Sequence, residues 1–334
     1  MVSATATLAL AVAACGSGSG GSSAESGNNA GSSGGSKLTI SYSQNVGDEI
    51  PLWIASDAGY FKKNGLDVTV TNITGNKGIP ALLSGQVDIA SIGGSDALSA
   101  AAAHADLKYI LTLIPTYTFQ FWAQPKYATA SALKGQRVGV TSASGSLYVG
   151  TVLSLKQLGL TPSDVQIVPL GSVANVNSAL LAGSVVAAAS HPPDTYKFKQ
   201  HGLKQLVDLP AKHIPAAISG FTVQSSYAQQ NPDVLQQVAK SIIQAIQRAK
   251  QDKAYAEKEM AKYMGVKSKG EADFTYDFYI NKLMKTVPLP KVDQFQATKT
   301  SLQKKNPNVA DVNLSSFIDQ QFVQKAASAL GVHQ

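Results

Sequence analysis

"QRVGVTSASGSLYVGTVLSLKQLG", residues 136–159, predicts a strand, a turn of small residues and then a helix. The apolar residues of "RVGV" suit a buried strand, and Val149, Val152 and Leu153 recur at helical spacing. The turn between them offers several hydroxyl groups and almost no side-chain bulk. Three uses suit such a turn: cradling a phosphate, positioning a substrate under attack, or holding a small molecule unchanged.

The same alternation of strand and helix extends to both sides of this stretch. Gly65 ends one helical pattern, and Ser95 is placed to cap the next. Strands are expected at residues 37–44, 66–74, 87–94, 107–115, 136–142, 164–170 and 185–191, and helices at 48–65, 78–85, 95–104, 146–159, 172–183 and 193–202. This order predicts an α/β fold with mixed, mostly parallel sheets flanked by helices.

Two short segments repeat one pattern. "ALLSGQVDIA" (81–90) and "ALLAGSVVAA" (179–188) share a helix end, a glycine and a strand. The repeat favours two lobes of similar architecture. Beyond it the chain is helical, with Asn231 as an N-cap and Pro232 in the first turn of a helix over 231–250. Further helices are expected near 254–264, 271–285, 293–304 and 314–330.

Composition excludes several function classes. The chain has 334 residues and a net charge of +7, without a basic stripe interleaved with aromatic residues, so no nucleic-acid partner is expected. "SASGS" (142–146) is not a G-x-S-x-G elbow, and neither a phosphate-binding loop nor a dinucleotide motif occurs. The five histidines lack metal-site spacing, and a single cysteine cannot build a zinc set. We therefore expect no enzyme activity, no cofactor and no metal.

The first residues predict export by a signal peptide and attachment to a membrane by a lipid. "ATATLALAVAAC" (4–15) is a short apolar run that ends in small residues, as in a secretory signal, and "VAAC" resembles a bacterial lipobox. A Gly/Ser-rich tract follows directly. We expect a signal peptide over 1–15, a lipid on Cys15, a disordered tether over 16–36, and a protein held at the outer face of a membrane. With one cysteine, an internal disulfide cannot form.

Several blocks resemble one family. "PLWIASDAGYFKKNGLDV" (51–68) is similar to the N-terminal signature of ABC-transporter substrate-binding proteins of the sulfonate/taurine/nitrate and thiamine-precursor (NMT1/THI5-like) type. Residues 75–98, 133–170 and 231–250 resemble later blocks of that family in matching order. The signature pattern is carried by Pro51, Ala55, Gly59, Phe61, Gly65, Leu66 and Val68.

The resemblance implies a two-lobe, type II periplasmic-binding-protein fold. Lobe I would comprise 37–121 plus 222–334, and lobe II 122–221. Two crossing segments, 118–124 and 219–224, would form the hinge, and the lobes would close on a small solute. Such a protein would deliver its solute to the permease of an ABC importer and act as a monomer.

The ligand cleft is expected where the strands end, because open α/β sheets bind ligands beyond the carboxyl ends of their strands. "SASGS" would present a helix N-terminus to an anionic or strongly polar group, with "GGSD" (93–96) on the opposite wall. Helix capping, tight turns and core packing are the alternative roles for these residues. The candidate ligand-binding residues are Tyr42, Ser43, Gln44, Asn45, Gly75, Asn76, Gly93, Gly94, Ser95, Tyr117, Phe119, Ser142, Ser144, Gly145, Ser146 and His191.

The solute itself is expected to be small and polar. Arg137 and Arg248 lie too far from the expected cleft to clamp an anion, although Lys77 could supply a positive charge. Where related proteins often have a W-E-P-like segment, this chain has "SHPPD" (190–194). A heterocycle or small organic acid therefore fits better than a bare inorganic anion. The alternatives are a ligand sensor or adhesion lipoprotein, and a pyrimidine-forming enzyme of the same fold, whose cysteine-rich iron segment this chain lacks.

Overall fold

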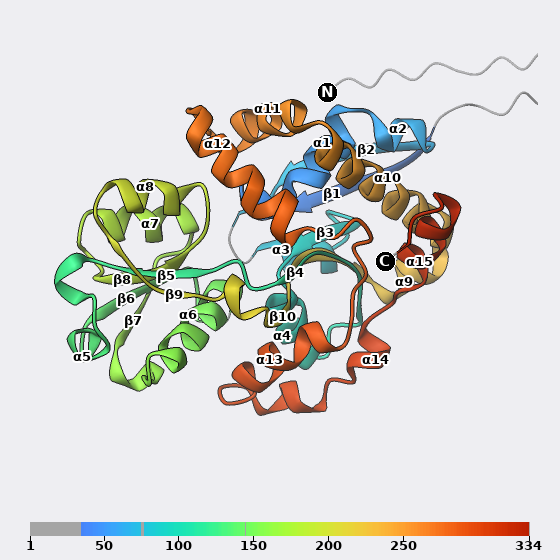
Figure 1. Ribbon diagram of the computed structural model, residues 1–334. Helices are drawn as coiled ribbons and strands as arrows, with labels where there is room; N and C mark the ends of the chain where they lie inside the picture. Colours follow the sequence, from blue (N-terminus) through green and yellow to red (C-terminus); the bar gives the residue numbers. More distant parts are fainter. Residues whose placement is uncertain (1–34, 75–76, 144, 334) are drawn as a thin grey trace, which may run out of the picture. The chain divides into compact units, whose positions relative to one another are not determined.

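Two mixed, five-stranded sheets organise residues 35–74, 77–143 and 145–333, which are those described by this computed structural model (Figure 1). The predicted positions Cys15, Gly75, Asn76 and Ser144 lie outside the described residues, as does the tract up to residue 34. The first sheet has the order β2-β1-β3-β10-β4. Its strands are β1 (Ser36–Tyr42), β2 (Leu66–Asn72), β3 (Ile89–Ile92), β4 (Leu107–Thr116) and β10 (Pro215–Gln224).

The second sheet repeats this topology, with the order β7-β6-β8-β5-β9. Its strands are β5 (Gln120–Ala123), β6 (Arg137–Val140), β7 (Gln166–Pro169), β8 (Ala187–Ser190) and β9 (Lys204–Asp208). In each sheet four strands run in one direction, and one strand, β10 or β5, runs against them between two neighbours. The expected α/β class with mixed, mostly parallel sheets is confirmed. Strands β5, β9 and β10 come from segments around the chain crossings, which the sequence does not predict as strands.

The repeated sequence pattern occupies equivalent places in the two sheets. One copy joins α3 (Gly78–Leu83) to β3, and the other joins α7 (Val173–Leu181) to β8. In both, the shared glycine has a left-handed backbone, with φ of 73° at Gly85 and 74° at Gly183. A left-handed residue ends a helix without steric cost only when it lacks a Cβ, which explains the glycine in both copies.

Helices cover both faces of each sheet (Figure 1). Over the first sheet, α1 (Ile50–Asp57) packs on α10 (Pro232–Gln251), whose Leu235, Ile242 and Ile246 are fully buried, as the amphipathic pattern predicts. On its other face lie α4 (Gly94–Ala102) and α13 (Asp293–Leu302). The remaining α-helices are α2 (Tyr60–Lys63), α5 (Ala130–Leu133), α6 (Ser146–Gln157), α8 (Asp194–Gln200), α9 (Ser225–Gln230), α11 (Lys253–Met264), α12 (Lys269–Tyr276), α14 (Leu314–Phe317) and α15 (Gln321–Ala329).

Some predicted helices are divided. The single helix expected over 48–65 is wrong: Gly59, with φ of 70°, separates α1 from α2. The helix expected over 271–285 is α12 followed by a π-helical segment, Asp277–Leu283. The helix expected over 314–330 is two helices, because Ile318 leaves the helical conformation and pairs with Tyr109 of β4.

The chain crosses between the sheets twice, a few residues away from the expected hinge segments. Residues 120–123 already belong to β5, and residues 219–224 lie inside β10. The crossings are therefore residues 117–119 and 209–214. They lie side by side, since Thr116 Oγ1 donates to the Ile214 carbonyl at 2.9 Å and Leu209 N–H to the Phe119 carbonyl at 3.1 Å.

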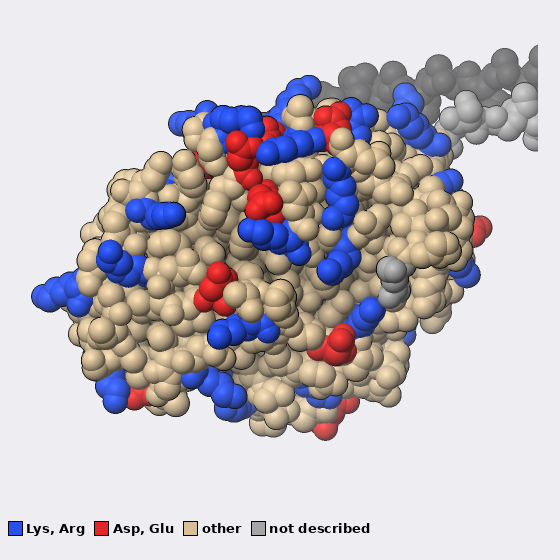
Figure 2. Space-filling view, in the orientation of Figure 1, with Lys and Arg blue, Asp and Glu red and all other residues tan. Residues whose placement is uncertain are grey.

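Charged side chains are mixed in sign over the face drawn in Figure 2. Around α11 and α12, lysines and carboxylates form linked pairs, including Lys253 with both Glu257 and Asp273. Such exposed pairs contribute little stability, typically about 0–1 kcal/mol each. On the face shown, the positive charge is scattered rather than gathered into a stripe.

Candidate functional site

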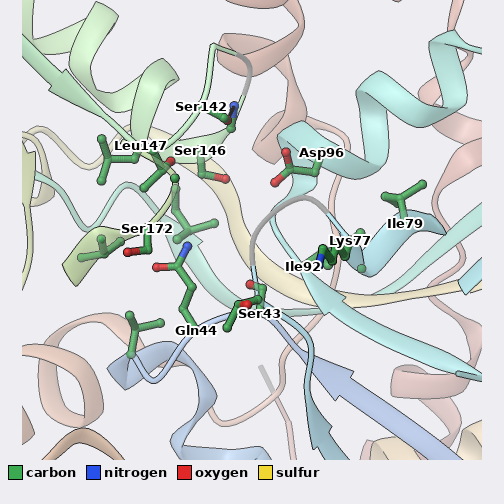
Figure 3. Close-up of a pocket in the computed structure, with 18 of the residues that line it drawn as sticks. Ser43, Gln44, Lys77, Ile79, Ile92, Asp96, Ser142, Ser146, Leu147 and Ser172 are labelled. Carbon is green, nitrogen blue, oxygen red and sulfur yellow. Dashed lines mark hydrogen bonds between the residues drawn. The ribbon is translucent and has the colours of Figure 1, made fainter. Parts of the chain in front are cut away.

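A cavity of about 960 Å³ opens where strands of both sheets end (Figure 3). Its walls come from the turns after β1, β3, β6, β7 and β8 and from the first turns of α3, α4, α6 and α7. The sequence places a cleft at these strand ends, and the structure has one there. We call this cavity the cleft.

Seven of the sequence-predicted residues line the cleft: Ser43, Gln44, Phe119, Ser142, Gly145, Ser146 and His191. Six other described residues do not line it: Tyr42, Asn45, Gly93, Gly94, Ser95 and Tyr117. Tyr117 is buried away from it, with its hydroxyl 3.0 Å from Thr298 Oγ1, and burial raises its pKa to about 12. Tyr42 packs edge-on against Trp53, with ring centroids 5.7 Å apart. Both tyrosines have the core role that the sequence left as an alternative.

The N-termini of α4 and α6 meet at one end of the cleft. Gly93 is the N-cap of α4 and Gly145 is the N-cap of α6. Ser95 does not cap α4 as predicted, because its Oγ lies 2.9 Å from Ser146 Oγ in a hydrogen bond that joins the two helices. The glycines permit this approach: a Cβ on Gly93 would lie 2.3 Å from Ser146 Oγ.

A small variant tests this contact. Gly93→Ala forces the Ser146 hydroxyl away from Ser95 and should lower the free energy of unfolding by about 1 kcal/mol. Adding Ser146→Ala removes the clashing oxygen, so the double variant should lose less stability than the two single variants combined. Urea unfolding of the four proteins measures the difference. Strict additivity would contradict the contact.

The hydroxyl turn before α6 is partly used by the chain itself. Ser142 Oγ accepts a hydrogen bond from Gly145 N–H at 3.0 Å, which closes the turn that leads into α6. On the same wall, Ser172 Oγ accepts from Asn175 N–H at 3.2 Å and caps α7. Ser43 and Gln44 point into the cleft from the turn after β1 (Figure 3).

Three carboxyl groups gather at the cleft and beneath it. Asp48 and Asp96 line it, and burial raises the pKa of each to about 6, with the charge of His191 opposing the shift at Asp48. Glu49 lies deeper, 2% exposed, and accepts hydrogen bonds from Ser91 Oγ at 2.9 and 2.8 Å. Burial raises the pKa of Glu49 to about 8. The sequence shows Asp96 within "GGSD" and Asp48 within "DEIPLW", but neither pattern indicates that these side chains turn inward.

His191 lies within an aromatic cluster that joins the two sheets. Its ring centroid is 6.0 Å from that of Phe119 and 6.2 Å from that of Tyr279. The Tyr279 hydroxyl donates to the Pro192 carbonyl at 3.2 Å, and its ring packs directly over Gly47. Tyr279 comes from the π-helical segment, far along the chain, so no local pattern connects it with the cleft.

The arrangement suits binding through hydrogen bonds. The hydroxyls of Ser142 and Ser146 have partners that are not bases, so neither is set up as an activated nucleophile. Among the described residues, no group of three or more His, Cys, Asp or Glu side chains is placed to hold a metal ion.

Comparison with known proteins identifies the family. The sequence profile described as NMT1/THI5 like matches residues 47–256. The chain belongs to the NMT1/THI5-like family. This confirms the resemblance to substrate-binding proteins that the sequence motifs indicate. Among curated protein sequences, no significant match is found.

Solved structures share the fold of this NMT1/THI5-like chain at low sequence identity. The alkanesulfonate-binding protein SsuA from Xanthomonas axonopodis pv. citri, bound to MOPS, is 21% identical, with a TM-score of 0.71, over 85% of this chain and 98% of its own. The nitrate-binding protein NrtA from Synechocystis PCC 6803 is 13% identical, with a TM-score of 0.67, over 89% of each chain. A Candida albicans protein described as having the generic periplasmic binding protein fold is 19% identical, with a TM-score of 0.67, over 85% of this chain and 96% of its own. The chain therefore has the periplasmic-binding-protein fold.

None of the described helices of this NMT1/THI5-like protein is both long and apolar enough to cross a bilayer.

Proposed function

We propose that this protein captures a small polar solute in the cleft and delivers it to an ABC importer, without chemical turnover. The observation that carries the proposal is the cleft itself: about 960 Å³, at the strand ends, with walls from both sheets. Small-molecule sites fall in this size range and at this place in α/β folds. Family membership supports the transport role.

The proposed motion is closure of two lobes around the cleft. Lobe I carries the first sheet and the C-terminal helices, and lobe II carries the second sheet. The two chain crossings at 117–119 and 209–214 are the proposed hinge. Closure brings α4 against α6, where Ser95 and Ser146 pair.

The proposed solute is organic rather than a bare inorganic anion. Among the described lining residues, Lys77 is the one lysine and is exposed, and there is no arginine to clamp an oxyanion. Hydroxyl groups, Gln44 and the Phe119 ring supply hydrogen bonds and an apolar surface. These groups fit a small heterocycle or similar molecule.

The location belongs to the same proposal. A lipid on Cys15, with residues 16–36 as a tether, would hold the protein at the membrane outside the cytoplasm. As a monomer, the protein could there reach the permease of an importer. The lipobox-like "VAAC" and the Gly/Ser tract support this.

Solute capture is tested with the small-molecule extract of a growth medium. Calorimetry and small-angle scattering should show stabilisation, of about 2.7 kcal/mol at a hundredfold excess over Kd, together with compaction. Gly145→Trp, which fills the cleft, should abolish both effects. Gln157→Trp, at the exposed far end of the same helix, is the matched control and should respond like the wild type. If Gly145→Trp responds equally, the solute binds elsewhere.

A further inference from the structure

The carboxylate of Asp96 occupies the place where the N-termini of α4 and α6 meet. Its Oδ2 lies 3.2 Å from the position of a Cβ on Gly93, and its Oδ1 lies 3.8 Å from that of a Cβ on Gly145. Those glycines are the N-caps of the two helices. Figure 3 shows Asp96 turned toward Ser142 and Ser146 across the cleft.

Two converging helix N-termini would otherwise attract an anion, because their unpaired N–H groups and dipoles concentrate positive potential. Here a side chain of the protein already supplies the negative charge. Its pKa of about 6 leaves it mainly ionised at neutral pH. A second anion at the same place would meet like charge inside a cleft that screens poorly.

A second, independent observation lies elsewhere in the cleft. Asp48 is only 5% exposed, lines the cavity, and its Oδ1 has no hydrogen-bond partner among the described residues. Thr118, fully buried on the same cavity, likewise has an unpartnered Oγ1. Buried polar atoms without partners cost free energy, so a hydrogen bond from a solute that reaches them when the cleft closes would be favourable.

The histidine and the lysine that line the cleft do not cancel the negative charge of Asp48 and Asp96. His191 faces Asp48 from the second sheet, and Lys77 lies on the wall next to α4. Lys77 is exposed, so water and salt screen its charge, whereas Asp48 is buried and Asp96 is partly buried.

We propose that the cleft selects a solute carrying a cationic nitrogen, such as an amine, an amidine or a protonated heterocycle, with Asp96 and Asp48 as its acceptors. The inference rests on the proposed solute-binding function. It separates this chain from its structural neighbours that bind alkanesulfonates or nitrate.

Benzamidine, benzamide and benzoate test the charge preference, because they have nearly the same shape and are cationic, neutral and anionic at neutral pH. In titration calorimetry at fixed salt, the wild type should bind benzamidine at least about tenfold more tightly than benzoate, with benzamide between them. Asp96→Asn should reduce that preference about tenfold. Asp67→Asn removes an exposed carboxylate of β2 and should leave the preference unchanged.

Circular dichroism verifies that each variant is folded, and Asp48→Asn, expected to act in the same direction, replaces Asp96→Asn if the latter unfolds. The absence of a preference for benzamidine, or a preference unaffected by both substitutions, would overturn the proposal. To distinguish a failure of this proposal from a failure of the proposed solute-binding function, the growth-medium extract is separated into fractions on ion exchangers. Stabilisation by the fraction retained on an anion exchanger rejects the cationic class alone, whereas no stabilisation by any fraction rejects solute capture itself.

Discussion

The Glu49→Gln variant should be more stable than the wild type at about pH 8, by on the order of 3 kcal/mol, and nearly equal to it at about pH 5. Burial raises the pKa of Glu49 from 4.5 to about 8. Between those values the folded protein keeps a proton that the unfolded chain releases. Stability is therefore greatest below pH 4.5 and falls as the pH rises toward 8. Glutamine has no proton to lose, so the variant escapes this loss.

Urea unfolding at several pH values measures the effect. Asp48, Asp96 and Glu259 also have raised pKa values, of about 6, 6 and 7, so the wild type also loses stability through these groups as the pH rises from about 4 to 7. The diagnostic quantity is thus the difference in stability between variant and wild type, which should grow steadily between about pH 5 and pH 8 and level off above pH 8. Asp67→Asn serves as the control. A difference that does not vary with pH would show that Glu49 is ionised in the folded protein throughout.

The Gly220→Ala variant should lose about 3 kcal/mol of stability. Gly220 lies in β10, where the pairing with β4 shifts register. A Cβ there would lie 2.0 Å from the Leu111 carbonyl oxygen and 2.4 Å from the Tyr109 hydroxyl. The backbone atom cannot move aside without breaking the sheet, so the central strand must distort.

Gly139→Ala in β6 is the matched control, because its Cβ would meet only side-chain atoms, the nearest at 3.2 Å. We expect Gly139→Ala to lower the free energy of unfolding by less than about 1 kcal/mol, because the neighbouring side chains can shift to make room for the methyl group. Chemical denaturation of both variants measures the contrast. Equal losses would mean that the close approach at Gly220 is relieved without strain.

Local sequence patterns predict most of the elements but not all of their partners. Period-two and period-3.6 signals predict β1, α10 and the repeated helix–glycine–strand unit, because each depends on neighbours in sequence. Strands β5, β9 and β10 are harder to predict, since antiparallel addition at a chain crossing is decided by which edge is free in the folded protein. The break at Gly59 is visible only as a glycine within an otherwise continuous helical pattern.

The cleft is likewise predictable from the sequence only in part. Its position follows from the rule that ligands bind beyond strand ends, and Ser43, Gln44, Phe119 and His191 line it as candidates. Asp48 and Asp96 are not among the candidates, because an aspartate near a helix start is ordinarily a capping residue at the surface. Thr118 is also absent from the candidates, because it lies in the chain crossing between β4 and β5, where no local pattern indicates a cleft. Only the fold shows that these side chains line the cleft, with Asp48 and Thr118 buried and Asp96 partly buried.

The hydrogen bonds between the two chain crossings constrain how the halves of the molecule can move. Thr116 pairs with Ile214 and Phe119 with Leu209, so the crossings form one two-stranded ribbon rather than two independent tethers. A ribbon of this kind bends and twists readily but resists sliding of one strand along the other. In the proposed closure, the lobes would therefore rotate about one axis, with little freedom to translate. Solutes of different size would then arrest the same rotation at different angles, and a single distance across the cleft would report the whole motion.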